Sequence, residues 1–186
     1  MNENRQNETI PLPSTLVLLS GGIDSATCVE YYTCRHYVVS ALFIDYSQPD
    51  CEREFSAASA ISSYYGIPLR RIAVSDCSVP EGYVPARNSL LLSLALMNFD
   101  HEYGLIALGI HAGTPYVDCS PDFVHEMQQV FDLYTNGRVR IDVPFLKWTK
   151  SEIWEYAQMK RVPVHLTHSN NLSDLRPAAD ELWKTR

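Results

Sequence analysis

The stretch Leu16–Ser25, which reads LVLLSGGIDS, lies near the start of the chain. Its apolar half has the length of a buried strand, two glycines interrupt it, and Ala26–Val29 then favours the first turn of a helix. Glycine lets backbone amides approach an anion closely, and the dipole of the new helix adds to the attraction. The stretch therefore predicts an α/β fold whose first loop binds the phosphates of a nucleotide.

Asp24 is the residue of this loop that a simple anion site does not need. A carboxylate beside a phosphate costs energy unless it caps the helix or meets a metal ion or a ligand hydroxyl. The alternative is an ordinary glycine turn with Asp24 or Ser25 as the helix N-cap. The loop lacks a Walker lysine and the spacing of a dinucleotide fingerprint. The predicted phosphate loop comprises Leu19, Ser20, Gly21, Gly22, Ile23, Asp24 and Ser25.

Composition and charge narrow the class of protein. The chain has 186 residues, 46% of them apolar, which suits one globular domain with a real core. A net charge of −7 argues against broad nucleic-acid binding, which needs a basic surface. No segment has membrane-spanning length, and Met1–Glu8 lacks the apolar centre of a signal peptide. Five scattered cysteines without a CxxC pair suit free thiols in a reducing cytoplasm.

Strand and helix patterns alternate along the chain. This order predicts one Rossmann-like α/β domain at 15–169, a five-stranded parallel sheet with helices on both faces, between polar tails at 1–14 and 170–186. The helix expected at Ser89–Asn98 is apolar on nearly all sides, which predicts that it is buried. Besides the first strand, we expect strands at Tyr37–Ile44, Arg70–Val74, Gly104–Gly109 and Val139–Val143, and helices at Ser25–Tyr32, Glu52–Tyr65, Ser89–Asn98, Pro121–Tyr134 and Thr149–Lys160.

Three further groups of polar residues follow predicted strands or begin predicted helices. Asp45–Gln48 follows the second strand, at the sheet edge where open α/β sheets bind ligands. Arg87 and Asn88 begin an apolar helix, so they either face that edge or form an ordinary helix start. Tyr116–Cys119 lies in the loop after the fourth strand. Asp118 either binds a ligand N–H group or caps the next helix. Cys119 is a nucleophile only if a base or a helix N-terminus activates its thiol.

The segments before and after the last predicted helix allow simpler interpretations. Thr149 and Glu152 have the spacing of a capping box, which leaves Lys150 free to act on an anion. His165 and His168 are too few ligands for a metal ion, so we expect surface or capping histidines there.

The glycine loop resembles the pyrophosphate loop of the PP-loop ATP pyrophosphatases, and five motifs together resemble one branch of them, the 7-cyano-7-deazaguanine synthases (QueC). That family reads SGGxDSxT, DYGQ with a glutamate-containing helix, VPGRN, YPDC and TKxEI in this order. The resemblance covers Leu16 to Ser169. The corresponding segments are Ser20–Thr27, Asp45–Gln48, Val84–Asn88, Tyr116–Cys119 and Thr149–Ile153.

The resemblance implies an ATP-dependent carbon–nitrogen ligase that uses Mg²⁺. Its members adenylate the carboxylate of 7-carboxy-7-deazaguanine, add ammonia to give the amide, and convert this to the nitrile preQ0. A homodimer is the family expectation. By position, Leu19–Ser25 would hold the ATP phosphates, and Tyr46 and Gln48 would border the nucleotide or acyl site. Arg87 and Asn88 would line the substrate site, and Tyr116, Asp118 and Cys119 would face the deazaguanine. The residues that would carry the chemistry are Asp24, Arg87 and Lys150.

Three departures from the family pattern bear on which nitrogen nucleophile accepts the acyl group. The family ends in a four-cysteine zinc site, whereas no cysteine follows Cys119 here, so no zinc is expected. The segment Ser75–Tyr83 is short, and Val117 and Ser120 replace a proline and an arginine. A more open site admits an amine larger than ammonia. QueC-like proteins of antiphage defence operons, including type IV CBASS, are divergent in this way, so the resemblance implies an amine of a partner protein as the second possible nucleophile.

Two other function classes stay open at this point. Another PP-loop amidotransferase or thiolase is one, although tRNA-thiolating relatives need catalytic cysteines and a basic face. A catalytically silent module that binds ATP or a deazapurine is the other. Pyrophosphate release separates the predicted ligase and the other PP-loop enzymes from the silent module.

Overall fold

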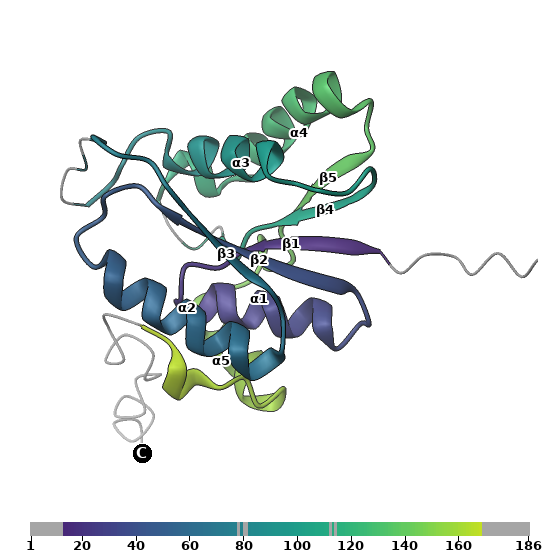
Figure 1. The fold of residues 1–186 in the computed structure, drawn as a ribbon. Helices are drawn as coiled ribbons and strands as arrows, with labels where there is room; N and C mark the ends of the chain where they lie inside the picture. Colours follow the sequence, from purple (N-terminus) through teal and green to yellow (C-terminus); the bar gives the residue numbers. More distant parts are fainter. Residues whose placement is uncertain (1–12, 78, 80–81, 112, 114, 169–186) are drawn as a thin grey trace, which may run out of the picture.

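Five strands form one fully parallel sheet in the order β3-β2-β1-β4-β5 (Figure 1). The computed structural model describes residues 13–77, 79, 82–111, 113 and 115–168. The chain order reverses between β1 and β4, and ligands of open α/β sheets bind at such a switch point. The strands are β1 (Ser14–Leu18), β2 (Val38–Asp45), β3 (Leu69–Ala73), β4 (Gly104–Ala107) and β5 (Val139–Asp142).

Helices cover both faces of the sheet, as predicted for a doubly wound fold (Figure 1). Helices α1 (Ile23–Thr33), α2 (Cys51–Tyr65) and α5 (Lys150–Met159) pack on one face. Helices α3 (Arg87–Met97) and α4 (Pro121–Thr135) pack on the other. Two short 3₁₀ turns, η1 (Val117–Cys119) and η2 (Val164–Leu166), follow β4 and α5.

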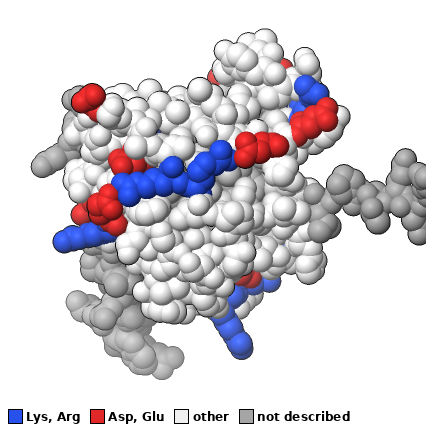
Figure 2. Space-filling model, viewed as in Figure 1, with Lys and Arg blue, Asp and Glu red and all other residues white. Residues whose placement is uncertain are grey.

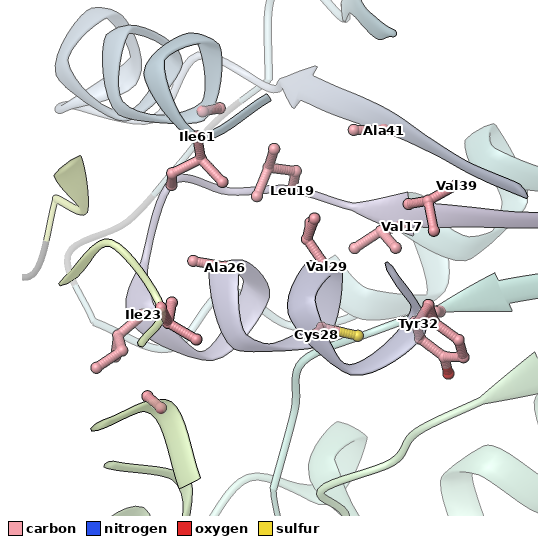
Figure 3. Packing of buried hydrophobic residues seen from close by; sticks show 14 of the residues in the cluster. Val17, Leu19, Ile23, Ala26, Cys28, Val29, Tyr32, Val39, Ala41 and Ile61 are labelled. Carbon is pink, nitrogen blue, oxygen red and sulfur yellow. The ribbon is translucent and has the colours of Figure 1, made fainter. Parts of the chain in front are cut away.

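The packing of α1 on β1 fixes the position of the first loop. Val17 and Leu19 of the strand segment lie against Ala26 and Val29 of the helix, and all four are at most 1% exposed (Figure 3). Burying a valine or leucine side chain stabilises a fold by about 1.5–3 kcal/mol. The Tyr32 hydroxyl, at the far end of α1, donates to Asp142 Oδ2 of β5 at 2.6 Å. Helix α1, whose first turn follows the glycine loop, is therefore anchored to the sheet along its length.

The prediction that the third helix is buried on all sides is wrong. In α3 only Asn88, Leu92 and Ala95 are buried, and Met97 is 81% exposed. The helix packs on the sheet with one face, and its remaining leucines lie half-buried at the surface. Apolar composition alone does not reveal whether a second layer covers the outer face.

Charged side chains on the β3 side of the molecule are paired. Arg70 contacts Asp100 at 2.8 Å, and Arg71 contacts both Asp45 and Glu52. Figure 2 shows basic atoms on this face as a narrow band with acidic atoms at both ends. These ion pairs leave no broad basic surface in this view, as a protein of net charge −7 leads one to expect.

The described residues include the predicted start of the domain but not the predicted C-terminal tail. Strand β1 begins at Ser14, one residue before the predicted domain boundary, and the tail predicted at 170–186 lies outside the described residues. All five cysteines are free thiols. Within the described ranges, no helix combines the length and the apolar character that crossing a bilayer requires.

Candidate active site

The glycine loop joins β1 to α1 with its polar groups turned toward one point. Gly22 is the helix N-cap and no side chain caps the helix, so neither Asp24 nor Ser25 is the N-cap. The Ser25 hydroxyl donates to the Gly22 carbonyl at 2.9 Å, and the Ser20 and Ser25 hydroxyls lie 3.2 Å apart. The amides of the first helical turn have no side-chain acceptor, which suits an anion at this helix N-terminus.

Close approach of neighbouring backbone fixes the shape of this loop. Gly21 has a φ of +84°, and a Cβ there would lie 2.4 Å from the Glu54 carbonyl oxygen of α2. A Cβ on Gly109, which follows β4, would lie 2.7 Å from the Asp24 carbonyl carbon. The loop is thus held between α2 and the end of β4, and these two positions admit no side chain without a backbone shift.

Lys150 is not free, in contrast to the sequence prediction. Its Nζ donates to both carboxylate oxygens of Asp24 at 2.6 Å, across 126 residues of sequence. The predicted capping box of Thr149 and Glu152 is confirmed, and it sets Lys150 as the first residue of α5. The backbone and side-chain donors of Thr149 hold the pKa of Glu152 below its usual range. The cap therefore directs Lys150 toward the glycine loop.

Polar side chains that follow β2 line the same cleft. The Gln48 side chain accepts from the Tyr46 amide at 2.9 Å and donates to Glu54 Oε2 at 2.9 Å. Burial raises the pKa of the Tyr46 phenol, and the nearby Arg87 guanidinium partly offsets this. Glu54 escaped the sequence analysis as an individual site residue, because its only signal was its place in the helix after Asp45–Gln48.

Asn88 connects α3 to η1 behind the cleft. Its side-chain amide donates to the Asp118 carbonyl at 2.9 Å and approaches Cys119 Sγ at 3.8 Å, while its backbone N–H lies 3.3 Å from Asp118 Oδ2. Asp118 is only 3% exposed, and its Oδ1 has no hydrogen-bond partner among the described residues. Cys119 is buried as well, so its thiol contacts Asn88 rather than lying open in the cleft.

Two positions of this region carry a strained backbone. Ser47 has a φ of +67° and Ala86 a φ of +61°, in the left-handed region that favours glycine. Both replace a glycine of the family patterns DYGQ and VPGRN. The chain keeps these turns although each costs about 1 kcal/mol relative to glycine.

One cleft at the switch point collects most of the predicted residues. Gly21 and Ile23 do not line it, because Gly21 lies against α2 and Ile23 is buried in the core. Lys150 reaches it through Asp24, and Tyr116, Asp118 and Cys119 belong to the wall behind Asn88. The predicted residues that line the cleft are Leu19, Ser20, Gly22, Asp24, Ser25, Tyr46, Gln48, Arg87 and Asn88.

Two histidines near the loop have positions that the sequence did not indicate. His111 follows β4 and is buried; its Nδ1 accepts from the Gly113 amide at 3.2 Å. Burial lowers the pKa of His111, Asp24 acts in the opposite direction, and Lys150 lowers it further. Of the two histidines expected at the surface, His165 is exposed and His168 is half-buried. The His168 backbone amide donates to the Gly21 carbonyl at 2.9 Å, and its imidazole Nε2 lies 3.9 Å from Asp50 Oδ2, so this residue contacts the glycine loop.

Among the described residues, a group with metal-ligand spacing consists of Asp45, Cys51 and Glu52. Arg71 donates to both carboxylates, so a guanidinium already neutralises them. Hydrogen bonding to Arg71 holds the pKa of Asp45 below its usual value. This group is an ion-pair network beside the cleft, and the four-cysteine segment of the family pattern falls largely outside the described residues.

The strand order and a glycine loop at the switch point define a nucleotide-binding protein of the PP-loop ATP pyrophosphatase class. Solved structures agree with this fold: the U34-tRNA thiolase NcsA from Methanococcus maripaludis aligns with a TM-score of 0.58 at 16% identity, over 88% of this chain and 62% of that chain. A predicted tRNA methyltransferase subunit from Methanocaldococcus jannaschii aligns with a TM-score of 0.54 at 15% identity, over 80% and 76%.

The chain belongs to the QueC family, described as queuosine biosynthesis protein QueC, whose model matches residues 14–78 and 71–176. A 7-cyano-7-deazaguanine synthase 2 from Desulfitobacterium hafniense is 33% identical over 187 residues, covering 85% of this chain and 79% of that protein. A 7-cyano-7-deazaguanine synthase from Acetivibrio thermocellus is 31% identical over 180 residues, covering 82% of this chain and 81% of that protein. Family membership supports an ATP-dependent enzyme of 7-deazaguanine synthesis.

Proposed function

We propose that this protein is an ATP-dependent ligase that adenylates the carboxylate of 7-carboxy-7-deazaguanine and transfers the acyl group to a nitrogen nucleophile. The observation that carries the proposal is the shared cleft, where the Ser20–Ser25 loop, Asp24 with its partner Lys150, and Arg87 meet at the switch point. A phosphate loop, a cation and a second cation on the opposite wall are the groups that an attack of carboxylate on ATP requires.

In the first step, a carboxylate oxygen attacks the α-phosphorus of ATP and the bond to the pyrophosphate oxygen breaks. The amides and hydroxyls of Ser20–Ser25 hold the departing pyrophosphate. Lys150 and Arg87 neutralise the charge that builds on the phosphoryl oxygens. Asp24 orients Lys150. The Asp24 and Glu54 carboxylates line the cleft and suit Mg²⁺ carried by ATP, which would further neutralise phosphate charge.

In the second step, the nitrogen attacks the carbonyl carbon, AMP leaves with the former carboxylate oxygen, and the nitrogen loses a proton. Tyr46 and Gln48 border the nucleotide or acyl group, and Asn88 positions the wall that contains Asp118. Asp118 Oδ1 suits the N–H groups of a guanine-like ring, since it is buried without a partner among the described residues. Tyr116 and Cys119 belong to the same wall.

The nitrogen nucleophile is either ammonia, giving the amide and then the preQ0 nitrile, or an amine of a partner protein, as in nucleobase–protein conjugation for antiphage defence. The departures Val117 and Ser120 and the short segment 75–83 support the larger acceptor, because they reduce the covering of the substrate side.

A homodimer fits the large exposed apolar side chains of Met97 on α3 and Leu133 on α4, which are 81% and 82% exposed.

The test is release of pyrophosphate and AMP from MgATP, with and without 7-carboxy-7-deazaguanine, followed by the mass of the products. We expect release that depends on the acid, and a product mass that identifies ammonia or a protein amine as the acceptor. ATP binding without acid-dependent release, whatever amine is supplied, would refute the ligase and leave a nucleotide-binding module.

A further inference from the structure

Two tyrosines from different loops stack on each other beside the substrate wall. Tyr83 lies four residues before α3, and Tyr116 directly precedes η1. Their ring centroids are 5.0 Å apart and their planes differ by 13°. The hydrogen bond of Asn88 to Asp118 joins the segments that follow these two tyrosines, so the same parts of the chain are linked twice, by the ring pair and by this bond.

This ring pair differs from the other aromatic contacts of the molecule. The other ring pairs within the described ranges cross at 48° or more, as edge-to-face packing in protein interiors does. Tyr83 is 39% exposed and Tyr116 is 37% exposed. Neither phenol oxygen has a hydrogen-bond partner in the described part of the chain. The pair is therefore an exposed parallel stack, which can accept a further flat ring without breaking a hydrogen bond.

A second observation indicates which flat ring this is. Asp118 follows Tyr116 by two residues, and its buried Oδ1 has no hydrogen-bond partner among the described residues. A buried carboxylate oxygen without a partner is costly, so a ligand that supplies N–H donors gains affinity there. An aromatic heterocycle with N–H groups along one edge satisfies both features, because its face suits the tyrosines and its edge suits the carboxylate.

We propose that Tyr83 and Tyr116 are the stacking platform for the deazaguanine ring, and that Tyr83 is a substrate-binding residue of this protein. The inference rests on the proposed function and adds to it the means by which the ring is held. Stacking of a base on an aromatic side chain corresponds to about a 5- to 150-fold change in affinity. Because the glycine loop lies on other elements, ATP affinity does not depend on these rings.

Calorimetric titration of Tyr83→Leu and Tyr83→Phe with 7-carboxy-7-deazaguanine, and separately with MgATP, tests the platform. We expect at least about fivefold weaker binding of the acid to the leucine variant, near-normal binding to the phenylalanine variant, and unchanged binding of ATP to both. Tyr103→Leu is the matched control, since Tyr103 is 63% exposed and directly precedes β4.

The outcomes separate this proposal from the proposed function. If the wild-type protein binds the acid and Tyr83→Leu binds it equally well, the platform is wrong and the ligase stands. If both ligands weaken together in Tyr83→Leu, the residue only supports the fold, and the platform is again wrong. If the wild-type protein does not bind the acid at all, both proposals fail.

Discussion

The glycine loop at Ser20–Ser25 and the wall made by the start of α3 with η1 belong to the same site but are built by different means. Backbone contacts hold the loop: Gly21 lies against the Glu54 carbonyl and Gly109 against Asp24. Side chains hold the wall, through Asn88 with Asp118 and the stacked tyrosines. The loop keeps the family motif unchanged, whereas the wall region has accumulated substitutions.

This contrast has a physical basis. A loop packed at backbone distance cannot accept a Cβ without a backbone shift, so we expect a substitution there to displace the proposed phosphate site as a whole. A wall held by side-chain contacts tolerates single changes such as Ala86, at the cost of a strained turn. We therefore expect the glycine loop to keep the same role in ATP cleavage, whereas the wall can change and with it the substrate that accepts the acyl group.

The largest expected effect is that of removing Lys150. Lys150→Ala leaves the Asp24 carboxylate without its 2.6 Å partner and removes a cation from the proposed phosphate site. We expect kcat to fall by about 10²–10³-fold, the range for loss of one preorganised charge-stabilising group. Steady-state pyrophosphate release measures it. Lys147→Ala, at an exposed lysine three residues earlier, is the control, and equal activities of the two variants would contradict the assignment.

The next effect compares two glycines of positive φ. Gly21→Ala places a Cβ 2.4 Å from a carbonyl oxygen, whereas Gly66→Ala has a similar φ and no atom within 4 Å. We expect Gly21→Ala to lower the free energy of unfolding by about 2–4 kcal/mol and to abolish ATP binding. For Gly66→Ala we expect a loss of about 1 kcal/mol with ATP binding intact. Urea unfolding measures both, and similar losses would show that α2 does not constrain the loop.

A smaller effect concerns pH. Burial and Lys150 place the pKa of His111 below its usual value of about 6.5, with Asp24 acting in the opposite direction. The folded state therefore favours the neutral imidazole: the associated stability is present above about pH 6.5 and is lost as pH falls through the lower folded pKa. We expect the melting temperature to decline below pH 6.5, and His111→Gln to reduce that decline. An identical pH profile of the two proteins would contradict the account.

The smallest effect is on the wall. Ala86→Gly relieves a left-handed φ of +61°, so we expect the protein to gain about 0.5–1 kcal/mol. Ala95→Gly, in the middle of the same helix, should have the opposite sign, with a loss of about 1 kcal/mol or more. Chemical denaturation of the two variants measures this difference, and destabilisation by Ala86→Gly would show that the turn is not strained.

Local patterns were sufficient for the strand–loop–helix unit, the five strands and the capping box of Thr149. They were insufficient wherever residues far apart in sequence meet. The contact of Lys150 with Asp24 spans 126 residues, and that of Asn88 with Asp118 spans 30, so neither has a sequence signal. The exposure of Met97 was missed because an apolar helix looks the same whether or not another layer covers it. His111 had no distinguishing pattern in its loop.

The most direct test of the central claim uses 7-carboxy-7-deazaguanine labelled with oxygen-18 in its carboxylate. If the carboxylate is adenylated in this cleft, one labelled oxygen passes to AMP when the nitrogen nucleophile displaces it, and mass spectrometry of the AMP detects it. We predict singly labelled AMP in an amount equal to the amide or conjugate formed. The amide or conjugate keeps the other labelled oxygen on any route, so unlabelled AMP, with the displaced label in another product or in water, would contradict adenylation of the carboxylate.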